Sequence, residues 1–139
     1  MELRQTRSIA IGDGAFANAE AQIETNNAIS AHSAVWVSGN KGETLSDQDA
    51  VVFRNLVKNK AIHAFMQYVS LTRLDFDDAA EAAVQGFSIF LFESPGARQV
   101  WLEEENLIEE QFGPSKVGRT TWKRRVQENL ARLDRSAAK

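Results

Sequence analysis

The chain contains no cysteine, and only two prolines and eight glycines occur among its 139 residues. Without cysteine it has no disulfide scaffold, no thiolate nucleophile and no cysteine-ligated metal or iron–sulfur site. This absence does not fix the cellular compartment. The scarcity of proline and glycine leaves room for long uninterrupted helices. The composition, with 43% hydrophobic and 25% charged residues, is that of a globular protein.

Long hydrophobic runs are also missing. The longest apolar-dominated run, 82–92, is interrupted by Gln85 and Ser88, whereas a transmembrane helix needs about 20 such residues. No apolar stretch follows the arginines of the first seven residues, so the pattern of a signal peptide is not present. We therefore expect membrane association only through a segment that this sequence does not contain, and a cytoplasmic or membrane-associated location both stay open.

Apolar residues recur at helical spacing in five segments, for which we predict helices over 14–37, 46–72, 75–93, 97–111 and 119–135. The second is the best defined, because Ser46 can cap its first turn and Asp49 completes a capping-box-like pattern. The loop before it is predicted over 38–44, and Ser94-Pro95-Gly96 is predicted to separate the third and fourth helices.

These elements predict an all-α fold, an antiparallel bundle of four to five helices. Residues 1–13 are predicted to form a flexible N-terminal arm, 14–135 a single helical domain and 136–139 a disordered tail. The helix over 75–93 is apolar nearly all round near its end, which predicts that it is the central, most buried helix. Its small residues Ala79, Ala83 and Gly86 predict that a neighbouring helix approaches it closely.

The charges are distributed unevenly. Residues 75–113 include ten acidic residues and one basic residue, and 114–139 include eight basic and two acidic ones, although the net charge is only −3. The acidic helix, with Glu103 and Glu104, could lie beside the basic helix within one chain or across a dimer. Since exposed ion pairs each contribute only about 0–1 kcal/mol, such pairs would serve orientation rather than stability.

Four short motifs occur in order: Trp36-Val37-Ser38-Gly39, then Leu45-Ser46-Asp47-Gln48-Asp49 with Phe53, then Leu74-Asp75, then Ser94-Pro95-Gly96-Ala97-Arg98-Gln99-Val100-Trp101. In this order they resemble a group of bacterial helical proteins of unknown function, over residues 34–105. The resemblance implies a soluble helical domain, which in many members follows one transmembrane helix. That helix is absent here, so the resemblance implies either the soluble part of a longer protein or a soluble relative. It transfers no catalytic residue.

Several residues have both a structural and a functional interpretation. His63 borders an apolar stripe, which favours a partly buried histidine over a ligand or general base in a pocket between helices. Asp75, Asp77, Asp78 and Glu81 lack the glycine and distal glutamate of a calcium loop, so helix capping explains them better. No metal, cofactor or catalytic set is expected.

Trp101 and Trp122 follow the helical apolar spacing and are predicted to lie in the core, but if exposed they would mark an interface. Lys123, Arg124 and Arg125 form a basic cluster that could contact phosphates, against which the sequence pI of about 5.4 argues. The sequence thus favours a protein-interaction or self-association module. An enzyme or small-ligand binder near His63 and a nucleic-acid binder using the last helix are the alternatives.

Overall fold

A computed structural model describes the backbone of residues 20, 22–111 and 116–139, and the side chains of 20, 22–104 and 121–139. Within these residues every regular element is a helix and no strand occurs, which confirms the all-α prediction. The helices are α2 (Ser33–Asn40), α3 (Asp47–Arg73), α4 (Asp77–Glu93), α5 (Pro95–Gln111) and α6 (Lys116–Ala137). Residues 22–31 form a further helix ahead of α2. The arm predicted over 1–13 lies outside the described residues.

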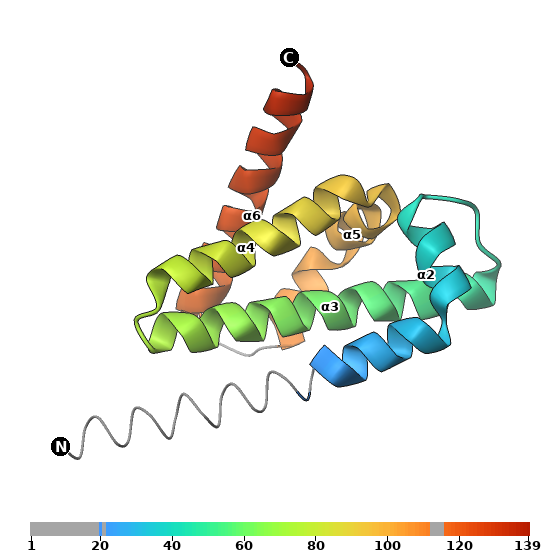
Figure 1. Cartoon of the computed structure of the whole chain (residues 1–139), viewed down its shortest axis with the longest axis horizontal. Coiled ribbons are helices and arrows are strands. Elements are labelled where there is room, and N and C mark those ends of the chain that lie inside the picture. Colours follow the sequence, from blue (N-terminus) through green and yellow to red (C-terminus); the bar gives the residue numbers. More distant parts are fainter. Residues whose placement is uncertain (1–19, 21, 112–115) are drawn as a thin grey trace.

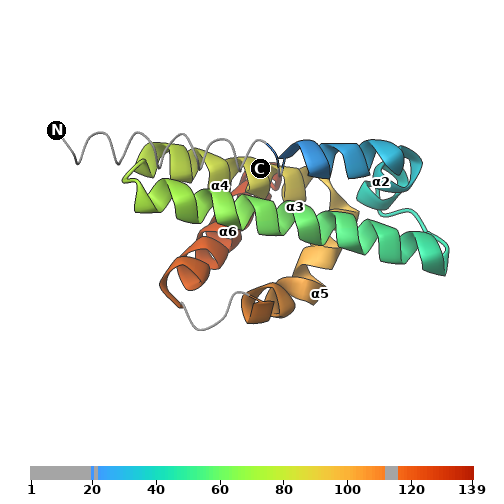
Figure 2. The ribbon, with the colours of Figure 1, turned by 90° about the horizontal axis from the view of Figure 1, so that it is seen from below.

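Helices α3 and α4 form the centre of the molecule and run side by side in opposite directions (Figure 1). Helices α5 and α6 lie across the same face of this pair, α5 mainly against α3 and α6 mainly against α4 (Figure 2). Helix α2 packs against α3 and also contacts α5. Because α5 and α6 cross the central pair at an angle, the antiparallel bundle of four to five helices stays a prediction.

The start of α3 follows directly from its sequence. The hydroxyl of Ser46 accepts a hydrogen bond from the backbone N–H of Asp49 at 3.2 Å, which confirms the predicted cap. The helix then runs for 27 residues. Its buried side chains occupy one stripe at helical spacing, which includes Phe53, Val57, Ala61 and Phe65.

The turn between α3 and α4 differs from the prediction in one respect. Asp75 does not open the next helix but adopts a positive φ of 60°, a conformation that aspartate tolerates better than most residues. Helix α4 begins at Asp77, and no side chain caps its first turn. Asp77 and Asp78 lie in that turn, where the positive end of the helix dipole favours their charges. The acidic cluster therefore acts there through charge rather than through capping hydrogen bonds.

Four other features predicted from the sequence need correction. Gly39 lies inside α2 rather than in a loop, and the helix predicted over 14–37 is interrupted at His32. Helix α5 begins at Pro95, because the first helical position needs no backbone N–H donor and suits the fixed φ of proline. Helix α6 extends to Ala137, two residues into the segment predicted as a tail.

An aromatic cluster occupies the place where α3, α4, α5 and α6 meet. The rings of Trp101 and Trp122 lie edge to face with centroids 5.2 Å apart, and Phe87 lies 5.5 Å from each of them. Phe65 meets Trp122 at 5.3 Å. Edge-to-face pairs of this kind contribute about 0.5–1.5 kcal/mol beyond their buried area. The cluster therefore fixes the crossing of all four helices.

Helix α4 is central but not buried all round. Val84 and Leu91 are fully buried, whereas Ile89 of the same helix is 44% exposed. Gly86 is exposed and a Cβ added there would meet nothing within 4 Å, so the predicted close approach at this glycine is wrong. In the described part of the chain, no helix is both long and apolar enough to cross a membrane.

Candidate functional site

Residues from three of the four motifs, Gly39, Phe53 and Gly96, come together where α2, α3 and α5 meet. A Cβ on Gly96 would overlap the backbone carbonyl oxygen of Gly39 and lie 2.8 Å from its carbonyl carbon. A Cβ on Gly39 would in turn lie 2.5 Å from atoms of the Phe53 ring. The two glycines therefore permit α2 and α5 to cross in backbone contact, with Phe53 of α3 packed against the crossing.

Trp36 of α2 packs the junction of α2, α3 and α5 against α4. Its ring stacks on Phe90 with centroids 5.7 Å apart and an interplanar angle of 5°, and it lies 5.9 Å from Phe53. Lys60 of α3 places its Nζ 4.8 Å from the centroid of the Phe90 ring. Three helices thus meet around one aromatic ring, and Trp36 holds α2 in the position from which Gly39 reaches α5.

An open groove of about 330 Å³ lies beside this junction. Its size is at the lower end of the roughly 300–1,000 Å³ of typical ligand pockets. Its lining combines apolar side chains and glycine backbone with a few polar groups, and consists of Gly39, Gly42, Glu43, Leu45, Ala50, Phe53, Arg54, Pro95, Gly96, Gln99, Val100 and Glu103. We call this surface the α2–α3–α5 groove.

Ion pairs between α3 and α5 border the groove. Arg54 donates to Glu103 at 2.6 Å and to Glu104 at 2.7 Å, and Lys58 Nζ lies 3.6 Å from the second oxygen of Glu104. The hydrogen bonds to Glu103 and then Glu104 raise the pKa of Arg54 above its usual value. Donation from Gln99, then from Arg54, lowers the pKa of Glu103. Both side chains therefore stay charged at neutral pH.

These pairs correct the charge pairing expected from the sequence. Glu103 and Glu104 contact basic residues of α3 rather than the basic helix α6. The cause is geometric, since α5 packs mainly against α3. An ion pair does join α5 to α6, but it comes from Arg98, which makes a two-pronged pair with Asp134 at 2.9 and 2.6 Å. This pair raises the pKa of Arg98 and lowers that of Asp134.

Two arginines of the predicted basic cluster are engaged within the chain. Arg125 pairs with Glu81 of α4, and Arg124 Nε lies 3.8 Å from the carboxylate of Glu128 one turn along α6. Lys123 also makes an interaction. Because phosphate binding would compete with these partners, the intramolecular pairs weaken the nucleic-acid interpretation.

Trp101 and Trp122 are 2% and 3% exposed, which confirms their predicted place in the core. They cannot serve as surface anchors for a partner unless the helices separate. The indole N–H of Trp122 has no hydrogen-bond partner among the residues whose side chains are described. The Trp122 ring packs against the rings of Phe65, Phe87 and Trp101, so packing rather than hydrogen bonding stabilises its position.

His63 is half-buried on α3 and does not line the α2–α3–α5 groove. Burial, followed by the nearby charge of Lys60, lowers its pKa, and burial lowers the pKa of Lys60. His32 is exposed. Among the described residues no group of three or more histidine, aspartate or glutamate side chains is placed to hold a metal ion. The groove and His63 are therefore separate features.

Arg54, Gln99 and Glu43 were not singled out from the sequence, although they border the groove. The sequence does place Arg54 and Lys58 one turn apart on α3, where they share one face of the helix, and this spacing could have indicated a basic patch.

Comparison of the chain with protein-family models, curated proteins and solved structures found no match. The resemblance to the bacterial helical group therefore stays a prediction.

Proposed function

We propose that the chain is a protein-interaction or self-association module that binds its partner in the α2–α3–α5 groove. The observation that carries this proposal is the groove itself, which combines an apolar floor with charged side chains at its border. Leu45, Phe53 and Val100 contribute apolar surface, and Glu43, Arg54 and Glu103 contribute charge. Apolar surface supplies affinity in protein interfaces, while charged groups at the border select the partner.

The construction of the groove supports a binding role. The backbone contact of Gly39 with Gly96 and the ion pairs of Arg54 hold its walls together without a ligand. A surface that is already formed loses little conformational entropy when a partner binds. In this proposal the motif residues shape the groove, and a bundle of four to five helices is the scaffold that presents it.

A pair of neighbouring substitutions tests the proposal. Ala50 lines the groove, so Ala50→Trp should fill it and weaken binding. Val51 is 60% exposed and does not line the groove, so Val51→Trp is the matched control and should leave binding unchanged. Binding is measured by sedimentation velocity for self-association, and by cross-linking with mass spectrometry for other proteins.

A selective loss in Ala50→Trp supports the groove as the binding surface. Equal effects of both substitutions contradict it. So does a wild-type chain that stays monomeric and cross-links to no partner in a cell lysate.

A further inference from the structure

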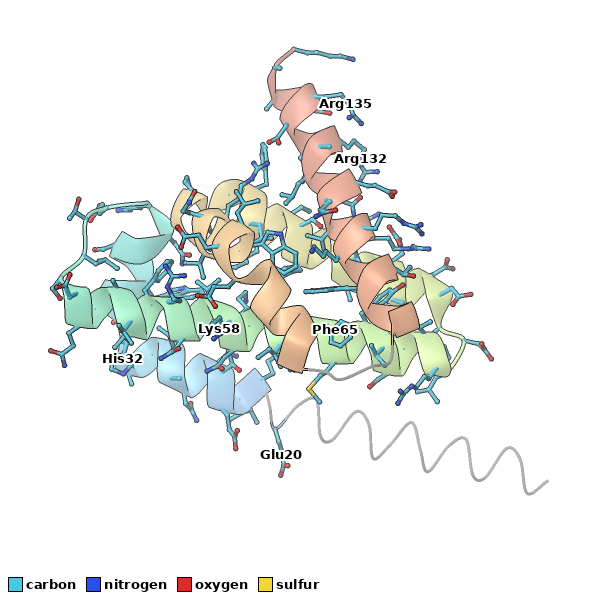
Figure 3. The ribbon with its side chains drawn as sticks, turned by 180° about the vertical axis from the view of Figure 1, so that it is seen from behind. Glu20, His32, Lys58, Phe65, Arg132 and Arg135 are labelled. Atoms are coloured by element: carbon cyan, nitrogen blue, oxygen red, sulfur yellow. The ribbon has the colours of Figure 1, made fainter. Side chains whose placement is uncertain are left out.

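The end of α6 projects from the body of the protein (Figure 1). The last buried residues of α6 are Asn129 and Leu130, and beyond them every residue is exposed except Leu133, which is half-buried. Figure 3 shows Arg132 and Arg135 on this projecting part. We call residues 131–139 the α6 extension. The pair of Asp134 with Arg98 connects this extension to α5.

The α6 extension carries positive charge that the described residues do not fully neutralise. Its single acidic residue, Asp134, is paired with Arg98. Arg132 donates to the side chain of Asn129. The side chains of Arg135 and Lys139 have no ion pair with the described residues. Within the part of the chain that the structure describes, the guanidinium of Arg135 is therefore unpaired, and it lies one turn from the small side chains of Ala131 and Ala138.

The α2–α3–α5 groove contains carboxylates that could pair with the positive charge of the α6 extension. The carboxylate of Glu43 has no ion pair within the described part of the chain, and Glu103 adds a second carboxylate to the border. An arginine can lay its aliphatic stem on apolar surface while its guanidinium reaches a carboxylate. Leu45, which is half-buried, supplies such surface in the same groove. Arginine is also one of the residue types that most often dominate binding energy at interfaces.

We propose that the α6 extension of one copy of this chain binds in the α2–α3–α5 groove of a second copy, with Arg135 placed against Glu43. This inference rests on the proposed function and names its partner. The extension points away from the body that carries the groove, so the contact joins two molecules (Figures 1 and 3). Two different surfaces meet, so the contact forms either once per pair in a head-to-tail chain or twice, reciprocally, in a closed two-fold dimer.

The test exchanges the two charges. Glu43→Lys and Arg135→Glu should each weaken self-association of the full chain by about tenfold or more, the effect of losing one charge-assisted pair. An equimolar mixture of the two variants should associate again, because each groove then finds an extension of opposite charge. The measurement is sedimentation equilibrium at low salt. Thermal unfolding of each variant checks that it is folded.

Two further variants control for net charge. Glu24→Lys and Arg73→Glu make the same changes at exposed positions that form no ion pair with any described residue, and they should leave association unchanged. The inference is overturned if wild-type protein is monomeric up to millimolar concentration, or if the mixture fails to recover association.

Two other outcomes separate this inference from the proposed function. Association that Ala50→Trp abolishes but that both charge reversals leave intact would keep the groove and reject the α6 extension as its occupant. Binding of a DNA duplex, lost in Arg135→Glu, by a chain that does not self-associate would reject the inference in favour of a nucleic-acid partner.

Discussion

Replacing Gly96 by alanine tests the backbone contact on which the groove depends. The added methyl group would overlap the carbonyl oxygen of Gly39 and lie 3.3 Å from the backbone nitrogen of Gly42. These are backbone atoms, so no rotation of a side chain can relieve the overlap. Helix α5 would therefore have to move away from α2.

Two opposing effects determine how Gly96→Ala changes the free energy of unfolding. Alanine is favoured over glycine within a helix by up to about 1 kcal/mol, and by less at the second residue of α5. Overpacking costs about 1–3 kcal/mol, and a rigid backbone contact lies at the upper end of that range. We therefore expect Gly96→Ala to lower the free energy of unfolding by about 2 kcal/mol. Gly39→Ala should cost less, because the overlapping atoms belong to the Phe53 side chain.

Gly86→Ala is the matched control. This glycine lies inside α4 with no atom near its added methyl group, so alanine should stabilise the protein by about 0.5–1 kcal/mol. Urea unfolding followed by tryptophan fluorescence measures all three variants. With a slope of about 1–3 kcal/mol per molar urea, the Gly96→Ala midpoint should fall by roughly 1 M. If Gly96→Ala is as stable as Gly86→Ala, the close crossing of α2 and α5 is refuted.

Two further predictions concern α3. Ser46→Ala removes the hydrogen bond to Asp49 and should destabilise the protein by about 1 kcal/mol in the same assay, and an unchanged midpoint would contradict the cap. Burial and Lys60 lower the pKa of His63 below its usual 6.5, so the unfolded chain takes up that proton more readily. The stability contribution of neutral His63 is therefore complete above about pH 7.5 and is lost as the pH falls through the folded-state pKa. His63→Gln should flatten the dependence of the urea midpoint on pH between about 7.5 and 5.5, and a slope equal to that of wild type would reject this assignment.

Local sequence patterns predicted the helices well where one stripe of apolar residues and a clear cap agreed. In α3 the cap at Ser46 and the buried stripe with Phe53 and Phe65 both follow from residues within a few turns of each other. The apolar spacing of Trp122 and Val126 likewise located the buried face of α6. The helix boundaries were predicted wrongly at Gly39 and Pro95. Glycine and proline are typical of loops, but both of these residues lie within helices.

The sequence by itself determined that the chain is helical, where its longest helix begins and which aromatic residues enter the core. Only the tertiary structure decided that Gly39 meets Gly96 and that Glu103 pairs with Arg54, 49 residues away, instead of with α6. Caps and apolar stripes depend on atoms separated by one or two turns, whose geometry any helix fixes. A groove or an ion pair between helices depends on their crossing angles and rotations, which the packing of the whole core sets.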